Sequence, residues 1–251
     1  MYDEKYLELI EEQIQEHEII ERFIRKMVSN NESLQILEAG CGKRWPFKLE
    51  GIQHILTGID IDKDALEIRK NSVADLHETI EGDLYSVELE ANSYDVIYCS
   101  FVLEHIKKAD LVIENFVKWA KPNGIIIIKI PDPFSVQGYI TRISPHWFHV
   151  FYYRFILGKK NTGKPGYGPY PTYYNPIVSR SGIHNFCNDG RNNITLEAEY
   201  GDGYFRPGRG FWKTLICVFK KGITIISFGV LTDKHTNLLY ILRKKNIYNL
   251  F

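Results

Sequence analysis

Apolar strand-like runs alternate with helical segments from residue 34 to residue 131, and this alternation constrains the fold more than any other feature of the sequence. The apolar runs predict five strands, at about 35–39, 55–59, 78–80, 94–100 and 125–130. Between them, the spacing of apolar residues predicts helices at 63–71 and 109–120. Units of strand, helix and strand form right-handed crossovers and a parallel sheet. We therefore predict an α/β fold with a doubly wound, Rossmann-like sheet.

The first predicted strand ends in a glycine turn. In the stretch E-A-G-C-G, Glu38 comes before Gly40, Cys41 and Gly42. Glycine lacks a Cβ atom, so its backbone takes a positive φ easily and lies close to a ligand. A carboxylate at this edge can hold a cationic group. The turn alone fits several ligands, because two glycines spaced by one residue are a weak motif.

Three further polar residues stand where predicted strands end. They are Asp60, Asp83 and Ser100. In open α/β sheets, ligands bind beyond the carboxyl ends of the strands, near the point where the strand order reverses. Because Glu38 lies at the same edge, the four side chains together predict a ligand site there.

Composition excludes several classes of protein. The 251 residues include 31 basic and 31 acidic side chains, a balance that argues against nucleic acid as the partner. The four cysteines form no C-x-x-C pair, which argues against a zinc site or a disulfide framework. The N-terminal residues lack the apolar core of a secretory signal, and the apolar run at 222–232 is too short to span a bilayer. We expect a cytoplasmic protein.

The motifs at the strand ends resemble those of class I S-adenosylmethionine-dependent methyltransferases, in the small-molecule branch with methyltransferase domain 11/12 patterns. The resemblance covers about residues 34 to 131. It rests on E-A-G-C-G, G-I-D-I-D, E-G-D-L, Y-D-V-I-Y-C-S-F-V-L-E-H-I and K-P-N-G-I-I-I-I. It implies a seven-stranded, mostly parallel sheet with an antiparallel seventh strand, and S-adenosylmethionine as the cofactor.

The resemblance also implies which residues bind this cofactor: Glu38, Gly40, Cys41, Gly42, Asp60, Ile61, Asp83, Leu84 and Ser100. The glycines would lie against the methionine moiety above Glu38, and Asp60 would accept both ribose hydroxyls. Ile61 would pack on the adenine, whose amino group would donate to Asp83 beside the Leu84 backbone. Ser100, or its backbone, would face the methionine end.

An NAD-binding domain is the main alternative for this edge of the sheet. A dinucleotide fingerprint requires G-x-G-x-x-G, and its third glycine would fall at Trp45. The methyltransferase interpretation is therefore favoured. Lys43 and Arg44 stand where many methyltransferases carry a further glycine, so either the turn differs or these cations reach a substrate anion.

An aromatic-rich insertion, residues 132–190, follows the fifth strand. In the class that the chain resembles, such insertions supply a substrate lid, and we assign that role here as a hypothesis. Four tyrosines in its Gly- and Pro-rich loop are candidates for substrate binding: Tyr167, Tyr170, Tyr173 and Tyr174. A helix expected at 146–157 carries Trp147, Phe148, Phe151 and Phe155, which we expect to form a small satellite core.

Histidines are the candidate catalytic residues, because methyl transfer to oxygen benefits from a base with a pKa near neutrality. His105 lies just after the fourth strand and is the first choice, although it could instead cap the helix that follows. His146 and His149 are the next candidates. They lie on one helical face without a carboxylate or cysteine at ligand spacing, so we predict no metal site.

The two ends of the chain complete the predicted domain. Residues 1–33 are expected to form an N-terminal helix, at about 3–28, packed on a methyltransferase domain of residues 34–251. Strands six and seven are expected at 194–200 and 237–245. Between them, the apolar stretch 211–230 is either a helix that covers the sheet or, with 146–157, a patch that rests on a membrane.

The sequence thus predicts an S-adenosylmethionine-dependent methyltransferase that acts on a small molecule, most simply on a hydroxyl of a sugar, glycolipid or secondary metabolite. A membrane-associated enzyme with an isoprenoid or lipid-linked acceptor is one alternative. A non-catalytic module that binds the cofactor and pairs with a partner is another. The acceptor and the oligomeric state cannot be deduced from the residues.

Overall fold

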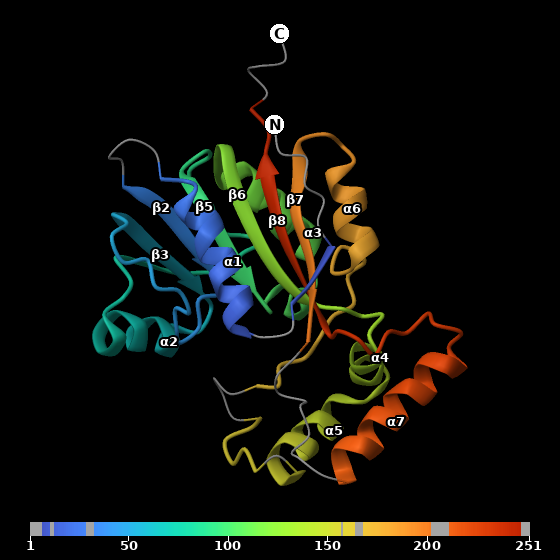
Figure 1. The fold of residues 1–251 in the computed structure, drawn as a ribbon. Coiled ribbons are helices and arrows are strands. Elements are labelled where there is room, and N and C mark those ends of the chain that lie inside the picture. The colour runs from blue at the N-terminus through green and yellow to red at the C-terminus, as the bar shows by residue number, and fades with distance from the viewer. Residues whose placement is uncertain are drawn as a thin grey trace.

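An eight-stranded mixed sheet organises the computed structural model, which describes residues 7–10, 13–28, 33–156, 158–163, 168–201 and 211–246 (Figure 1). The strand order is β1-β7-β8-β6-β5-β2-β3-β4. The strands are β1 (Leu7–Ile10), β2 (Leu34–Ala39), β3 (His54–Asp60), β4 (Glu78–Glu81), β5 (Tyr94–Ser100), β6 (Ala120–Pro131), β7 (Asn192–Tyr200) and β8 (Asn237–Lys244).

The strand directions confirm the predicted fold class. Strands β4, β3, β2, β5 and β6 are parallel, and β8 is antiparallel to both β6 and β7. Crossovers run outward in opposite directions from β2 and β5, so the strand order reverses between these two strands. This is the position where open α/β sheets bind their ligands.

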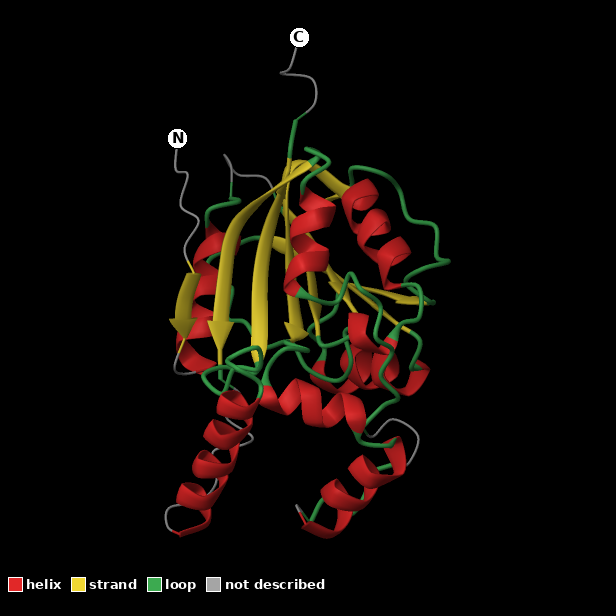
Figure 2. Ribbon diagram, turned by 90° about the vertical axis from the view of Figure 1, so that its right-hand side faces the viewer, coloured by secondary structure: helices red, strands yellow, loops and turns green. Residues whose placement is uncertain are grey.

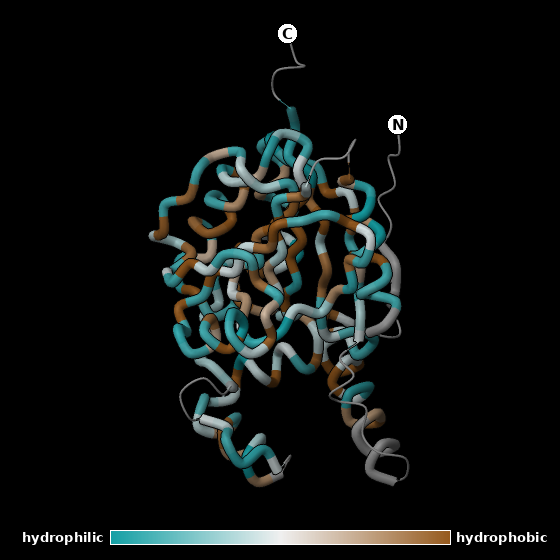
Figure 3. The backbone as a smooth tube through the Cα atoms, turned by 90° about the vertical axis from the view of Figure 1, so that its left-hand side faces the viewer, coloured by the Kyte–Doolittle hydropathy of each residue, from teal (hydrophilic) through white to brown (hydrophobic). Residues whose placement is uncertain are grey.

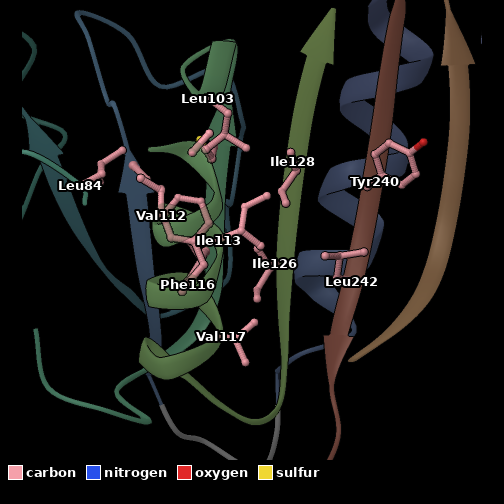
Figure 4. Packing of buried hydrophobic residues seen from close by; sticks show 14 of the residues in the cluster. Leu84, Leu103, Val112, Ile113, Phe116, Val117, Ile126, Ile128, Tyr240 and Leu242 are labelled. Carbon is pink, nitrogen blue, oxygen red and sulfur yellow. The ribbon is translucent and has the colours of Figure 1, made fainter. Parts of the chain in front are cut away.

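Helices cover both faces of the sheet. They are α1 (Gln13–Arg25), α2 (Lys63–Ile68, continued by a π-helical turn at Arg69–Val73), α3 (Ala109–Trp119) and α6 (Arg180–Cys187). Ile20 and Ile24 of α1 pack on one face, and Phe116 and Ile113 of α3 pack on the other against β6 and β8 (Figure 4). A buried ion pair between Glu16 and Lys129 also joins α1 to β6.

The N-terminal segment differs from the prediction of one helix over 3–28. Leu7–Ile10 forms β1, which pairs parallel with β7, and α1 begins only at Gln13. The edge of β7 would otherwise present unpaired backbone groups, and β1 satisfies them. The seven strands that the resemblance implies are present, and β1 adds an eighth strand beside β7.

Helices α4 (Val136–Ile143), α5 (His146–Phe151, followed by a π-helical turn at Tyr152–Ile156) and α7 (Phe211–Ile226) lie beyond the carboxyl ends of the parallel strands (Figures 1 and 2). Helix α7 contacts α4 and does not cover the sheet. The interpretation of 211–230 as a sheet-covering helix is therefore wrong. Its apolar residues have no face of the sheet to pack on.

The expected satellite core is also absent from the described residues of α5 and its π-helical turn. Trp147 is 68% exposed and Phe155 is 67% exposed, and Phe148 and Phe151 are exposed as well. Figure 3 shows hydrophobic segments in the two helical projections beneath the sheet. None of the helices in the described part of the chain is long and apolar enough to cross a membrane.

Candidate cofactor and acceptor site

The glycine turn follows β2 at the predicted position. Gly40 and Gly42 both have positive φ, of 69° and 51°. The N–H groups of Gly40 and Cys41 donate to the Ile59 carbonyl, and the Gly42 N–H donates to Asp60 Oδ2 at 2.8 Å. The turn is therefore tied to the end of β3, next to the position where strand order reverses.

Gly40→Ala is expected to lower stability by about 1–3 kcal/mol and to weaken cofactor binding. A Cβ atom at Gly40 would lie 2.3 Å from Val102 Cγ2, in a region of φ that alanine avoids. Gly42→Ala is the matched control, because φ is positive there too but nothing lies within 4 Å of the added atom. Thermal unfolding with and without S-adenosylhomocysteine separates the two. Equal losses in both variants would show that contact with Val102 is unimportant.

Arg69 completes the floor of this turn, and sequence reasoning missed it. Its side chain is fully buried and donates to Glu38 Oε2 at 2.9 Å, Asp75 Oδ1 at 2.7 Å and the Cys41 carbonyl at 2.9 Å. Burial raises the pKa of Glu38, and the charge of Arg69 opposes that rise. Glu38 therefore holds the turn through Arg69, and its role toward the methionine moiety stays a prediction.

Cys41 contributes to the turn through its backbone. Its side chain is buried, and burial raises the pKa of the thiol to about 12, so the sulfur is neutral at physiological pH. The cofactor-binding role that the sequence assigned to Cys41 stays a prediction.

Asp60 and Ile61 lie at the end of β3 in positions that fit the predicted ribose and adenine contacts. The two carboxylate oxygens of Asp60 accept from the backbone N–H groups of Gly42 and Asp62. Ile61 is 72% exposed, so its side chain is open to a flat ligand. Asp62 caps α2 by accepting from the Ala65 N–H, which fixes the chain direction after the site.

Asp83 and Leu84 follow β4, and Ser100 ends β5. Asp83 is half-buried, Leu84 is buried, and the Leu84 carbonyl accepts from Asn115 Nδ2 at 2.9 Å. Ser100 is half-buried and aligns with Lys129 in the ladder between β5 and β6. The predicted cofactor residues therefore lie at the carboxyl ends of β2, β3, β4 and β5, on both sides of the point where the strand order reverses.

His105 ends a short 3₁₀ turn, Leu103–His105, directly after β5. Its Nδ1 lies 2.8 Å from the Pro171 carbonyl, which only accepts, so in the neutral ring Nδ1 carries the proton and Nε2 is free to accept one. Burial lowers the pKa of His105, against the opposing effect of that hydrogen bond. The ring is therefore neutral near pH 7.

The tyrosine loop of the insertion lies over this turn. The Tyr170 ring contacts the His105 ring edge to face, with centroids 5.7 Å apart, and the Tyr173 N–H donates to the Glu104 carbonyl at 2.7 Å. Burial raises the pKa of Tyr170, and the negative charges of Asp62 and Asp60 add to that rise. Tyr174 is exposed beside Arg142. Tyr167 lies outside the described residues.

Two cavities open beneath this loop. The larger has a volume of about 980 Å³ and is lined by His105, Tyr170 and residues of α4, α5 and α7. The smaller, of about 370 Å³, is lined by Tyr173, Tyr174 and residues of α4 and α6. Apolar atoms contribute most of the surface that lines the larger cavity, although polar side chains are interspersed among them. Such a mixture is typical of sites for small organic ligands.

The other two candidate histidines differ in their surroundings. His149 lines the larger cavity, and its Nε2 is buried without a hydrogen-bond partner among the described residues. His146 is exposed on α5, with its ring centroid 6.4 Å from that of His149. In the described part of the chain, no group of three or more His, Cys, Asp or Glu residues could hold a metal ion.

Comparison with known proteins identifies the family. A family model described as a methyltransferase domain matches residues 37–128. Over 213 residues the chain is 38% identical to the ubiquinone biosynthesis O-methyltransferase of Rickettsia prowazekii, with 78% of this chain and 73% of that relative covered. It is 27% identical over 130 residues to the demethylmenaquinone methyltransferase of Oceanobacillus iheyensis, covering 48% and 52% of the two chains.

The fold is similar to that of a solved S-adenosylmethionine-dependent methyltransferase from Archaeoglobus fulgidus. The TM-score is 0.52 at 15% identity, with 91% of this chain and 94% of that one covered. The chain belongs to the S-adenosylmethionine-dependent methyltransferases. Its cofactor is therefore S-adenosylmethionine, and its acceptor is a small molecule.

Proposed function

We propose that this enzyme transfers a methyl group to a hydroxyl of a small acceptor that carries a substantial apolar part. S-adenosylmethionine supplies the electrophilic methyl group. His105 Nε2 would take the proton of the acceptor hydroxyl as the hydroxyl oxygen bonds to the methyl carbon. The bond from that carbon to the sulfonium sulfur would break at the same time and leave S-adenosylhomocysteine. The observation that supports the proposal is that His105 lines the larger cavity and that its Nδ1 lies beside the Pro171 carbonyl, which leaves Nε2 of the neutral ring as the proton acceptor.

The apolar part of the acceptor is inferred from the lining of the larger cavity. Phe148, Tyr152, Ile140 and Phe219 contribute to its wall. An aromatic head with an isoprenoid or alkyl chain would cover this apolar part of the wall, which a sugar would leave without an apolar partner. The relatives named for ubiquinone biosynthesis and demethylmenaquinone methylation support this choice over the sugar acceptor considered from sequence.

A series of acceptors tests the proposal. We expect kcat/KM for 4-alkylphenols to rise about fourfold for each methylene added to the chain, because a buried methylene contributes about 0.8 kcal/mol. The rise should stop when the chain fills the cavity. Methyl glycosides are the comparison set, and labelled methyl transfer is the measurement. Faster methylation of the glycosides, or rates independent of chain length, would contradict the apolar acceptor.

We also propose that the surface formed by α5, its π-helical turn and residues 217–230, which comprise the end of α7 and the turn after it, rests on an anionic membrane. Residues 133–188 and 203–232 contain no Asp or Glu, although the whole chain has 31 acidic residues. Arg154, Lys159, Lys160, Lys220 and Lys221 lie in this acid-free region. The exposed apolar side chains of the proposed membrane surface are Trp147, Phe148, Phe151, Phe155, Val218, Phe219, Ile225, Ile226, Phe228 and Val230. Apolar and cationic groups together suit an anionic lipid surface.

Replacing Trp147 or Phe228 with serine is expected to weaken vesicle binding about tenfold in each variant. Burying one such apolar side chain in the lipid interface contributes about 1.5–3 kcal/mol to binding. Phe228 is 96% exposed in the protein alone, so its loss should not affect folding. Sedimentation with vesicles of phosphatidylcholine and phosphatidylglycerol measures the binding. Tyr85→Ser, an exposed aromatic outside this surface, is the control. Equal sedimentation of all variants would reject the surface.

A further inference from the structure

Glu104 carries a buried carboxyl group that takes no part in the proposed proton transfer to His105. Glu104 is the middle residue of the Leu103–His105 turn after β5, and it is only 7% exposed. Oε2 has no hydrogen-bond partner in the part of the chain that the structure describes. A buried polar atom without a partner costs free energy, so such an atom in a cavity wall points to a ligand that completes it.

Gln137 of α4 is in the same situation. Its Oε1 is also buried without a hydrogen-bond partner among the described residues. Glu104 and Gln137 both line the larger and the smaller cavity. Among the described residues, only Pro131, Thr141 and Thr172 also line both cavities. The two unsatisfied side chains therefore lie on the boundary where the cavities meet.

We propose that Glu104 and Gln137 form a polar anchor that binds a second oxygen or nitrogen substituent of the acceptor, distinct from the hydroxyl that faces His105. This proposal rests on the proposed function, because it concerns the same acceptor. The apolar chain of the acceptor extends along the larger cavity, and the anchored substituent points toward the smaller one. The anchor therefore determines how the acceptor is oriented beside His105.

The chemistry of the two side chains defines the substituent. Burial raises the pKa of Glu104 to about 8, so the carboxyl group is largely protonated at neutral pH. A protonated carboxyl and an amide each donate and accept hydrogen bonds. An uncharged hydroxyl, carbonyl or amide satisfies both, whereas an ionised group would enter the cavity without a counter-charge from this pair. The anchor therefore selects uncharged, doubly substituted acceptors.

Isothermal titration in the presence of saturating S-adenosylhomocysteine tests the anchor without requiring turnover. The probes are 4-pentylphenol and the two pentylbenzenediols that carry one further ring hydroxyl. We expect the protein to bind at least one diol about tenfold more tightly than the phenol, the effect of one added buried hydrogen bond. Glu104→Leu and Gln137→Leu should each abolish that preference while leaving phenol affinity within about threefold.

Thr172→Val is the matched control, because Thr172 lines the same two cavities, and it should keep the preference for the diol. Replacing Glu104, whose Oε2 is buried without a partner among the described residues, with leucine is not expected to unfold the protein, and thermal unfolding checks this. Equal affinity of the unmodified protein for phenol and diols would overturn the anchor, as would a preference that survives both leucine variants. Neither result would bear on whether His105 takes the proton, which is measured by methyl transfer.

Discussion

Replacing Arg69 with methionine is expected to lower the free energy of unfolding by about 3–5 kcal/mol. Methionine keeps most of the buried volume but removes the donors to Glu38, Asp75 and the Cys41 carbonyl. Glu38 Oε2 and the Cys41 carbonyl then remain buried without this donor, whereas the Asp75 side chain keeps partial contact with solvent. For a chain of this size, such a loss corresponds to a fall in Tm of roughly 10 °C. Urea unfolding followed by tryptophan fluorescence measures it.

The neighbouring Lys70→Met variant is the control, because Lys70 is exposed and its loss should change stability by less than about 0.5 kcal/mol. A second comparison tests the interaction between Arg69 and Glu38. Adding Glu38→Gln to Arg69→Met should restore part of the lost stability, because the amide donates and accepts hydrogen bonds and carries no charge. If Arg69→Met unfolds at the same urea concentration as the unmodified protein, the buried cluster does not stabilise the glycine turn.

The alternation of strands and helices was enough to predict the sheet, because it depends on local sequence. The strand over 94–100 was predicted with its observed bounds, and the antiparallel last strand was confirmed. The position of the candidate cofactor residues at one end of the sheet could be predicted as well, because paired parallel strands have their carboxyl ends on the same side. Leu7–Ile10 was missed because its apolar residues fit helical spacing, and only pairing with β7 makes it a strand.

Arg69, Glu104 and Gln137 could not be predicted for a different reason. Their importance depends on contacts between distant segments, and each looks like an ordinary polar residue of a helix or turn. Arg69 lies 31 residues from its partner Glu38, and no local pattern marks the pair. For the aromatic residues of α5 the prediction was wrong in the opposite sense, because they were expected to be buried and are exposed. Hydrophobic spacing indicated a buried face, but it cannot show whether protein or another surface covers that face.

The largest effect on catalysis is expected from His105→Gln, which should lower kcat about 10²- to 10⁴-fold. Glutamine keeps a donor for the Pro171 carbonyl, so the turn after β5 should retain its position. Affinity for S-adenosylhomocysteine should therefore stay within about threefold, as titration calorimetry would measure. Methyl transfer to the best 4-alkylphenol gives the rate.

The pH dependence separates a proton acceptor from a residue that only positions the tyrosine loop over the turn after β5. Burial lowers the pKa of His105 below its ordinary value of 6.5, and only the neutral ring accepts a proton. The rate of the unmodified enzyme should thus be constant around neutral pH and fall about tenfold per unit as pH drops below that lowered pKa. His105→Gln should lose this acidic limb. His146→Gln, on the exposed face of α5, should keep both rate and profile. An acidic limb that survives in His105→Gln would transfer the role of base to His149, whose Nε2 faces the same cavity.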